Sequence, residues 1–151
     1  MITSNYRLIY AAIFTIYSII NLTGCNEISQ GLQRQKFEFL YRMNTDATLL
    51  KDYTNGIQKY EDLDFYEIKL NRMYADIFKM KTIEGYSESR LLKENLMNIV
   101  EDNINSVKEL KRKQYPPGEI IRHEYEVIVM KEKTADFLER INDEIIKVGK
   151  E

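Results

Sequence analysis

Apolar residues recur every three or four positions through most of the chain beyond residue 30, which is the period of a helix with one buried face. Glycine and proline are rare there, and the few that occur divide this part of the chain into four segments. The pattern predicts helices over about 32–54, 62–83, 88–115 and from about 117–119 to 148. Their apolar stripes are Phe39, Met43, Ala47, Leu50 and Tyr53; Tyr66, Leu70, Met73, Ile77 and Met80; Leu92, Leu96, Ile99, Asn103, Val107 and Leu110; and Val127, Met130, Thr134, Phe137, Ile141, Ile145 and Val148.

Turn residues mark the predicted helix ends. Asn55-Gly56 is a turn signal after the first helix, and Pro116-Pro117-Gly118 ends the third helix sharply. Ser87 or Ser89 is the expected amino-terminal cap of the third helix, because a serine hydroxyl accepts a hydrogen bond from a free backbone N–H there. Short connections between amphipathic helices predict an all-α fold, a small antiparallel bundle of four helices. A bundle of three helices is the alternative, with Asn55-Gly56 a kink within one long first helix.

The amino-terminal stretch has a different character. The 13 residues from Leu8 to Ile20 carry no charge, and Arg7 is the single charged side chain before Glu27. A basic start followed by a short apolar segment is typical of a secretory signal peptide. The segment is shorter than the roughly 20 apolar residues that a membrane-spanning helix needs.

The residues that follow this segment are Leu22-Thr23-Gly24-Cys25, and they contain the only cysteine of the chain. They resemble the lipobox of bacterial lipoproteins, in which an aliphatic residue and two small residues precede an invariant cysteine. The resemblance covers residues 1–25. It implies that a peptidase cuts before Cys25 and that the Cys25 thiol carries a diacylglyceryl group, with two or three acyl chains in all. An uncleaved signal anchor, or a buried first helix with an incidental cysteine, are the alternatives.

The leader therefore predicts the domain organisation and the location of the chain. Residues 1–24 are the expected signal peptide, 25–36 a short polar tether and 37–151 a helical domain. Two or more acyl chains hold a protein firmly to a bilayer, whereas one chain binds only marginally. The mature protein is therefore expected on the extracytoplasmic face of the cell membrane or in the outer membrane.

Composition narrows the classes of partner. Removing residues 1–24 from the 151-residue chain leaves 127 residues, enough for one domain with a modest core. Arg7 is lost with the leader, so 21 basic residues remain against 24 acidic ones, and this mild acidity gives no sign of nucleic-acid binding. With Cys25 acylated no thiol remains, which excludes a disulfide framework and a cysteine metal site. We expect no cofactor other than the covalent lipid.

The charged side chains predict neither a catalytic nor a metal site. His123, the single histidine, shares a predicted helix face with Glu119, and a solvated surface explains the pair better than half of a metal site. Two clusters fit helix ends, where such charges stabilise the helix dipole. They are the acids Glu61, Asp62 and Asp64, with weak calcium binding as the alternative, and the bases Lys111, Arg112 and Lys113, with phosphate contact as the alternative.

Tyrosines provide the candidate interaction surface, because tyrosine is enriched where proteins bind one another. We expect a helical protein-interaction module of the cell envelope, serving a secretion, exclusion or wall-assembly partner; an enzyme is the weakest alternative. The other alternative is a binding or sensing domain that holds a small apolar ligand in the bundle core, in a void lined by methionines. The tyrosines of the surface are Tyr41, Tyr53, Tyr60, Tyr66 and Tyr74, and the methionines are Met73, Met80, Met97 and Met130.

Overall fold

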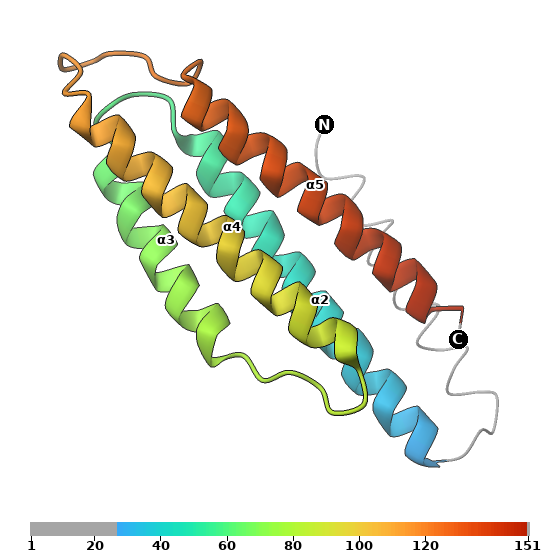
Figure 1. The fold of residues 1–151 in the computed structure, drawn as a ribbon. Helices are drawn as coiled ribbons and strands as arrows, with labels where there is room; N and C mark the ends of the chain where they lie inside the picture. The colour runs from blue at the N-terminus through green and yellow to red at the C-terminus, as the bar shows by residue number, and fades with distance from the viewer. Residues whose placement is uncertain (1–26, 151) are drawn as a thin grey trace.

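A computed structural model describes residues 27–150, which form four helices (Figure 1). They are α2 (Glu27–Gly56), α3 (Asp62–Lys79), α4 (Ser87–Arg112) and α5 (Tyr125–Val148). Consecutive helices run in opposite directions, and α2 packs most extensively on α5, and α3 on α4, so that α3 and α5 occupy opposite corners. The predicted all-α antiparallel four-helix bundle is confirmed. The three-helix alternative is wrong, because α2 ends at Gly56 and the chain reverses before α3.

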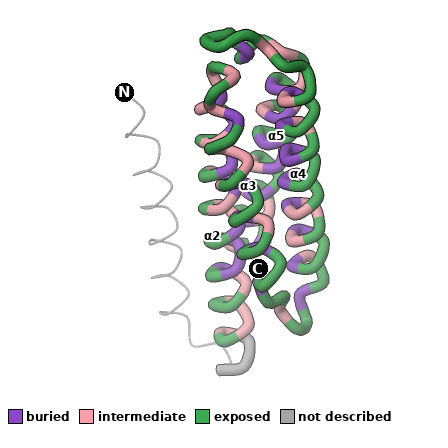
Figure 2. The backbone as a smooth tube through the Cα atoms, turned by 90° about the vertical axis from the view of Figure 1, so that its left-hand side faces the viewer, coloured by how far each residue is buried: buried purple, intermediate pink, exposed green. Residues whose placement is uncertain are grey.

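The core lies along the axis of the bundle and is built from the predicted apolar stripes. Figure 2 shows the buried positions on the inward side of each helix. Every predicted stripe residue is buried except Tyr53, Tyr66 and Ile99, which are partly buried against the core. The prediction omitted five further apolar residues of helices α2 to α4 that the core contains: Phe37, Leu40, Leu63, Val100 and Ile104.

The first helix is longer than predicted. It begins at Glu27 rather than Leu32, so the expected tether of residues 25–36 is helical from Glu27 onward. Gly31 lies within this stretch, and its polar neighbours did not suggest a helix. Since a helix rises about 1.5 Å per residue, its 30 residues make α2 about 45 Å long.

The second helix is shorter than predicted, and a lysine of the next helix explains where it stops. It ends at Lys79 rather than Ile83, because Met80 takes an extended conformation. The Lys93 ammonium of α4 donates to the backbone oxygens of Phe78 and Met80, both at 2.7 Å. These bonds satisfy carbonyl groups that a helix end leaves free.

Neither serine caps α4. The cap position is Tyr86, whose side chain makes no capping hydrogen bond. Ser89 is buried one turn later, where its hydroxyl donates to the Tyr86 backbone oxygen at 2.7 Å and accepts from the Ile83 N–H at 2.9 Å. Ser89 therefore fixes the α3–α4 loop from inside the helix that it was expected to start.

The last helix begins later than predicted, at Tyr125 rather than near residues 117–119. The third helix ends at Arg112, and Gln114 beyond it takes a left-handed conformation with φ 50°. Residues 113–124 therefore form a loop. The expectation that Glu119 and His123 share a helix face is wrong, because both lie in this loop.

Candidate interaction surface

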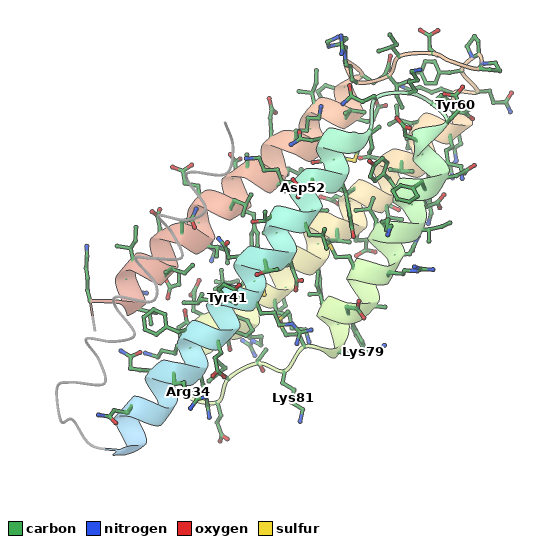
Figure 3. The ribbon with its side chains drawn as sticks, turned by 180° about the vertical axis from the view of Figure 1, so that it is seen from behind. Arg34, Tyr41, Asp52, Tyr60, Lys79 and Lys81 are labelled. Atoms are coloured by element: carbon green, nitrogen blue, oxygen red, sulfur yellow. The ribbon has the colours of Figure 1, made fainter. Side chains whose placement is uncertain are left out.

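The structure does not gather the five candidate tyrosines on one surface. Tyr41 is exposed partway along α2 (Figure 3), and Tyr74 of α3 is partly buried against the core. Tyr53 of α2 and Tyr66 of α3 pack against each other, with ring centroids 6.1 Å apart. Tyr60 lies in the turn between α2 and α3, at the end of the bundle opposite the start of α2. The candidate surface thus separates into four places.

Tyr60 belongs to the distal end of the bundle, defined here as the two loops 57–61 and 113–124 together with the exposed first residue of α5, Tyr125. Its ring packs against that of Tyr115 at 5.9 Å, and its hydroxyl donates to the Lys111 backbone oxygen at 3.1 Å. The loops also pair through an isolated antiparallel bridge between Lys59 and Ile120. Two loops far apart in sequence therefore form one connected surface.

Further hydrogen bonds hold the two loops of the distal end together. The Tyr60 N–H donates to the Glu119 oxygen and the Ile121 N–H to the Gln58 oxygen, both at 3.0 Å. The Glu61 carboxylate accepts from the Gly118 N–H. The backbone N–H groups of Glu61 itself and of Gly118 lower the pKa of this carboxyl. Glu61 therefore ties the loops together, which its acidic cluster in the sequence did not reveal.

Two apolar side chains stay exposed at the distal end. Ile120 is 54% exposed and Tyr125 is 76% exposed, although Ile121 beside them is completely buried. Tyrosine is among the residue types that contribute most to protein interfaces, so Tyr125 is a candidate contact residue, with Ile120 as exposed apolar surface at the same end. The sequence analysis missed both residues, because neither belongs to an apolar stripe. The closeness of Ile120 to Tyr60 depends on the pairing of the loops.

Ion pairs surround the distal end. The Lys111 ammonium lies 2.6 Å from a carboxylate oxygen of Asp64 and 2.8 Å from one of Glu67. The hydrogen bonds to these two carboxylates raise the pKa of Lys111, and the bond to Asp64 has the larger effect. Lys113 lies 2.9 Å from Glu126 and 3.0 Å from Glu124, and hydrogen bonds to these carboxylates raise the pKa of Lys113 as well.

The predicted basic cluster is therefore engaged within the protein. Arg112 forms an ion pair with Glu109, one turn earlier in α4. Lys111 and Lys113 form the ion pairs described above. The cluster is thus a set of structural ion pairs rather than a ready phosphate site. His123 accepts a hydrogen bond from the Arg122 side chain at 3.1 Å and is exposed in the loop.

An aromatic cluster of Tyr53, Phe65 and Tyr66 covers the junction of α2 and α3. Phe65 meets Tyr66 edge to face at 5.0 Å. The Tyr66 ring occupies the space where Gly56 has no side chain, since a Cβ at Gly56 would lie 1.8 Å from the Tyr66 hydroxyl oxygen. Gly56 is therefore required by close packing, although the sequence analysis assigned it only to a turn.

Two glycine-to-alanine changes in α2 test this contact. Alanine inside a helix normally stabilises by about 0.5–1 kcal/mol, and Gly31 has open space for it. We expect Gly31→Ala to raise the midpoint of urea unfolding. Gly56→Ala should lower the midpoint, with a loss of about 1–3 kcal/mol in the free energy of unfolding. The loss is expected because the clash with the Tyr66 ring outweighs what alanine gains in a helix.

The Tyr66→Ala background provides the control for Gly56→Ala. Removing the ring should remove the clash, so Gly56→Ala should cease to destabilise there. An equal loss of stability with and without the Tyr66 ring would contradict the proposed contact.

A groove lies between α4 and α5, with a volume of about 370 Å³. It is open to the surface, and the Lys133–Asp102 ion pair, 2.6 Å long, crosses between its two helices. None of the four methionines that were expected to line a ligand void lines this groove. Met73, Met80 and Met130 are buried in the core, and Met97 packs against the core. The groove residues are Asn95, Asn98, Ile99, Asp102, Lys133, Asp136, Phe137 and Arg140.

The predicted lipobox residues Leu22, Thr23, Gly24 and Cys25 lie outside the described residues. None of the helices from Glu27 to Val148 is long and apolar enough to cross a bilayer. Within residues 27–150, no three side chains of histidine, cysteine, aspartate or glutamate form a group that would hold a metal ion.

The chain matches no protein-family model, no curated protein and no solved structure.

Proposed function

We propose that this protein is a lipid-anchored, extracytoplasmic protein of the cell envelope whose helical bundle binds a partner protein. The observation that carries the proposal is the motif Leu22-Thr23-Gly24-Cys25 after a 13-residue uncharged segment. The bundle supports it, because α2 begins two residues after Cys25 and the four helices bury their apolar stripes against one another. A domain of this kind can follow directly on an acylated cysteine.

The distal end is the part of the bundle that we propose contacts the partner. It lies opposite the start of α2, and hence farthest along the bundle from an anchor at Cys25. Ile120 and Tyr125 expose apolar surface there, on loops whose backbone groups pair with each other. A preorganised surface loses little conformational entropy on binding, which favours a protein contact at this end.

The groove between α4 and α5 is a weaker candidate for the same role. Its opposing charges already pair with each other: Lys133 with Asp102, and Arg140 with Glu88 beyond the groove at 2.8 Å. A partner that binds the groove through its charged groups would have to break these ion pairs. The exposed apolar side chains of the distal end can contact a partner without the loss of an ion pair.

Site-specific photocrosslinking in intact membranes tests the distal end. A photoreactive phenylalanine analogue at Tyr125 should produce one discrete crosslinked protein. The matched control is Ile146, which is 52% exposed near the other end of the same helix and should produce none. Crosslinks at position 146 that equal those at 125, or none at either, would contradict a partner at the distal end.

A further inference from the structure

The outward face of α3 carries a row of apolar and basic side chains, named here the α3 stripe: Phe65, Ile68, Arg72, Ala75 and Lys79. Their spacing of three, four, three and four residues places them on one side of the helix. All five are exposed; Phe65 is 55% and Ile68 54% exposed. An exposed apolar row along a helix of a bundle indicates a surface that something else covers.

The cations along this face have no counter-charge to satisfy them. Arg72, Lys79 and the nearby Lys81 form no ion pair with any of the described residues, and Figure 3 shows Lys79 at the end of α3 and Lys81 in the following loop. Lys69 lies over the Phe65 ring, 5.1 Å from its centroid. The face therefore presents basic side chains mixed with large apolar ones.

Three of the four acids of α3 are engaged with other groups. Asp62 accepts hydrogen bonds from the Gln58 and Lys59 N–H groups at 3.0 and 2.8 Å. Asp64 and Glu67 pair with Lys111 of α4, as described above. The remaining acid of the helix, Asp76, lies near Asp46 of α2, which places it on the flank of α3 that turns toward α2. The α3 stripe itself contains no acid.

The corresponding outward face of α5 is different, although it also exposes apolar side chains. Ile128 and Ile146 lie on it, and so do three exposed acids: Glu132, Glu139 and Asp143. Since α3 and α5 occupy opposite corners of the bundle, the protein has one basic-apolar side and one acidic-apolar side. Exposed apolar area is thus common to both faces, and charge distinguishes them.

We propose that the α3 stripe is a second membrane contact, which lies on the surface of a bilayer that contains anionic lipids. The inference rests on the proposed lipid anchor, which would hold this face at high local concentration near the headgroups. A helix face that combines Phe and Ile with Lys and Arg is typical of a helix lying in the membrane interface. Anionic headgroups attract the cations, and the apolar side chains enter the boundary with the acyl chains.

The position of the anchor permits this orientation. Cys25 precedes the first residue of α2 by two positions, which reach at most about 7 Å when extended. An upright bundle would hold α3 away from the bilayer, but α2 and α3 are neighbours, so a bundle lying on its α2–α3 side keeps both the anchor and the α3 stripe at the membrane. Leu49 of α2, also exposed, lies one turn before Tyr53 on this side and adds apolar surface.

Fluorescence of the acylated protein on vesicles tests the proposal. With Cys25 acylated, an added cysteine is the only free thiol, so Ile68→Cys and Ile146→Cys can each carry a polarity-sensitive dye. On vesicles that contain phosphatidylglycerol, the dye at position 68 should shift its emission to the blue. It should not shift on phosphatidylcholine vesicles, and the dye at position 146 should not shift on either.

Charge reversal supplies the second variant. Arg72→Glu with Lys79→Glu changes two exposed side chains that lie outside the core, so the bundle should keep its helical circular dichroism. In this background the shift at position 68 should be lost on anionic vesicles. A shift that survives charge reversal or high salt, or an equal shift at position 146, would overturn the proposal.

Other outcomes separate this inference from the anchor. A shift at position 68 that depends on protein concentration and not on lipid charge would also overturn it, and would indicate a second copy of the chain as the occupant. Flotation with phosphatidylcholine vesicles reports the anchor alone. If the protein fails to float, the proposed function is wrong. The same dye comparison at 68 and 146, made in a Cys25→Ser background so that the added cysteine stays the only thiol, then still decides the α3 stripe on anionic vesicles.

Discussion

Replacing Cys25 by serine is expected to abolish acylation, so that the chain either keeps its leader or is released from the membrane. The thiolate is the reactive form of cysteine in such transfers, and a serine hydroxyl does not ionise near neutral pH. Each buried CH₂ group of a lipid chain contributes about 0.8 kcal/mol to membrane binding, so the loss of two chains removes stable anchoring altogether. Growth with a radioactive or clickable fatty acid, followed by membrane fractionation, measures both effects.

Asn26→Ser is the matched control for Cys25→Ser. It changes the neighbouring residue and leaves the thiol in place, so the protein should still take up fatty acid and sediment with membranes. If the Cys25→Ser chain takes up fatty acid and is processed as the original chain is, the sulfur of Cys25 is not the attachment point.

The second large effect is expected at Asn103, a residue of α4 that lies in the core of the bundle. This side chain is completely buried, and neither its amide nitrogen nor its oxygen has a hydrogen-bond partner among the described residues. An unsatisfied buried polar group costs about 1–3 kcal/mol. Leucine has the same branched shape without the polar atoms, so Asn103→Leu should stabilise the bundle by about that amount, measured as a higher urea midpoint.

Thr134→Val is the control, because Thr134 is equally buried but satisfied. Its hydroxyl donates to the Met130 backbone oxygen at 2.7 Å, and the change to valine keeps its shape. We expect little change in stability there. If Asn103→Leu lowers the urea midpoint instead, the Asn103 amide makes a hydrogen bond that stabilises the bundle. A stabilised variant that changes its oligomeric state would show that Asn103 sets helix register at a cost in stability, as buried asparagines do in coiled coils.

The helices could be predicted from the sequence because their stripes are long and regular. In α5, every predicted core residue from Val127 to Val148 is buried, since a 24-residue amphipathic pattern leaves one choice of inward face. The first turn of α2 was missed because it is polar and contains Gly31. Periodicity identifies a helix only where one of its faces is buried.

Helix ends and the distal end were harder to predict, because they depend on contacts between distant parts of the chain. The early end of α3 follows from Lys93, which belongs to the next helix and gives no local signal. The loop before α5 is held against the turn between α2 and α3, where the Ile121 N–H donates to the Gln58 oxygen. Pro116-Pro117-Gly118 marked the end of α4 but not the length of the loop that follows.

The neighbours of the candidate surface residues were hard to predict for the same reason. Tyr60 was named from composition, but its partner Tyr115 and the exposed Ile120 become its neighbours only when the two loops pair. The α3 stripe was not predicted either, because the apolar periodicity identifies the buried face of a helix and not its exposed face. Outward-facing Phe65 and Ile68 do not contribute to the core pattern, and their meaning depends on the charges around them.

The most direct test of the central claim is the mass of the amino-terminal peptide of the native protein, isolated from membranes. We predict a chain that begins at Cys25 and carries a thioether-linked diacylglyceryl group, with or without a third acyl chain on its amino group. A native chain from the soluble fraction that retains residues before Cys25 and a free thiol would contradict the lipid anchor, and with it the proposed location of the protein.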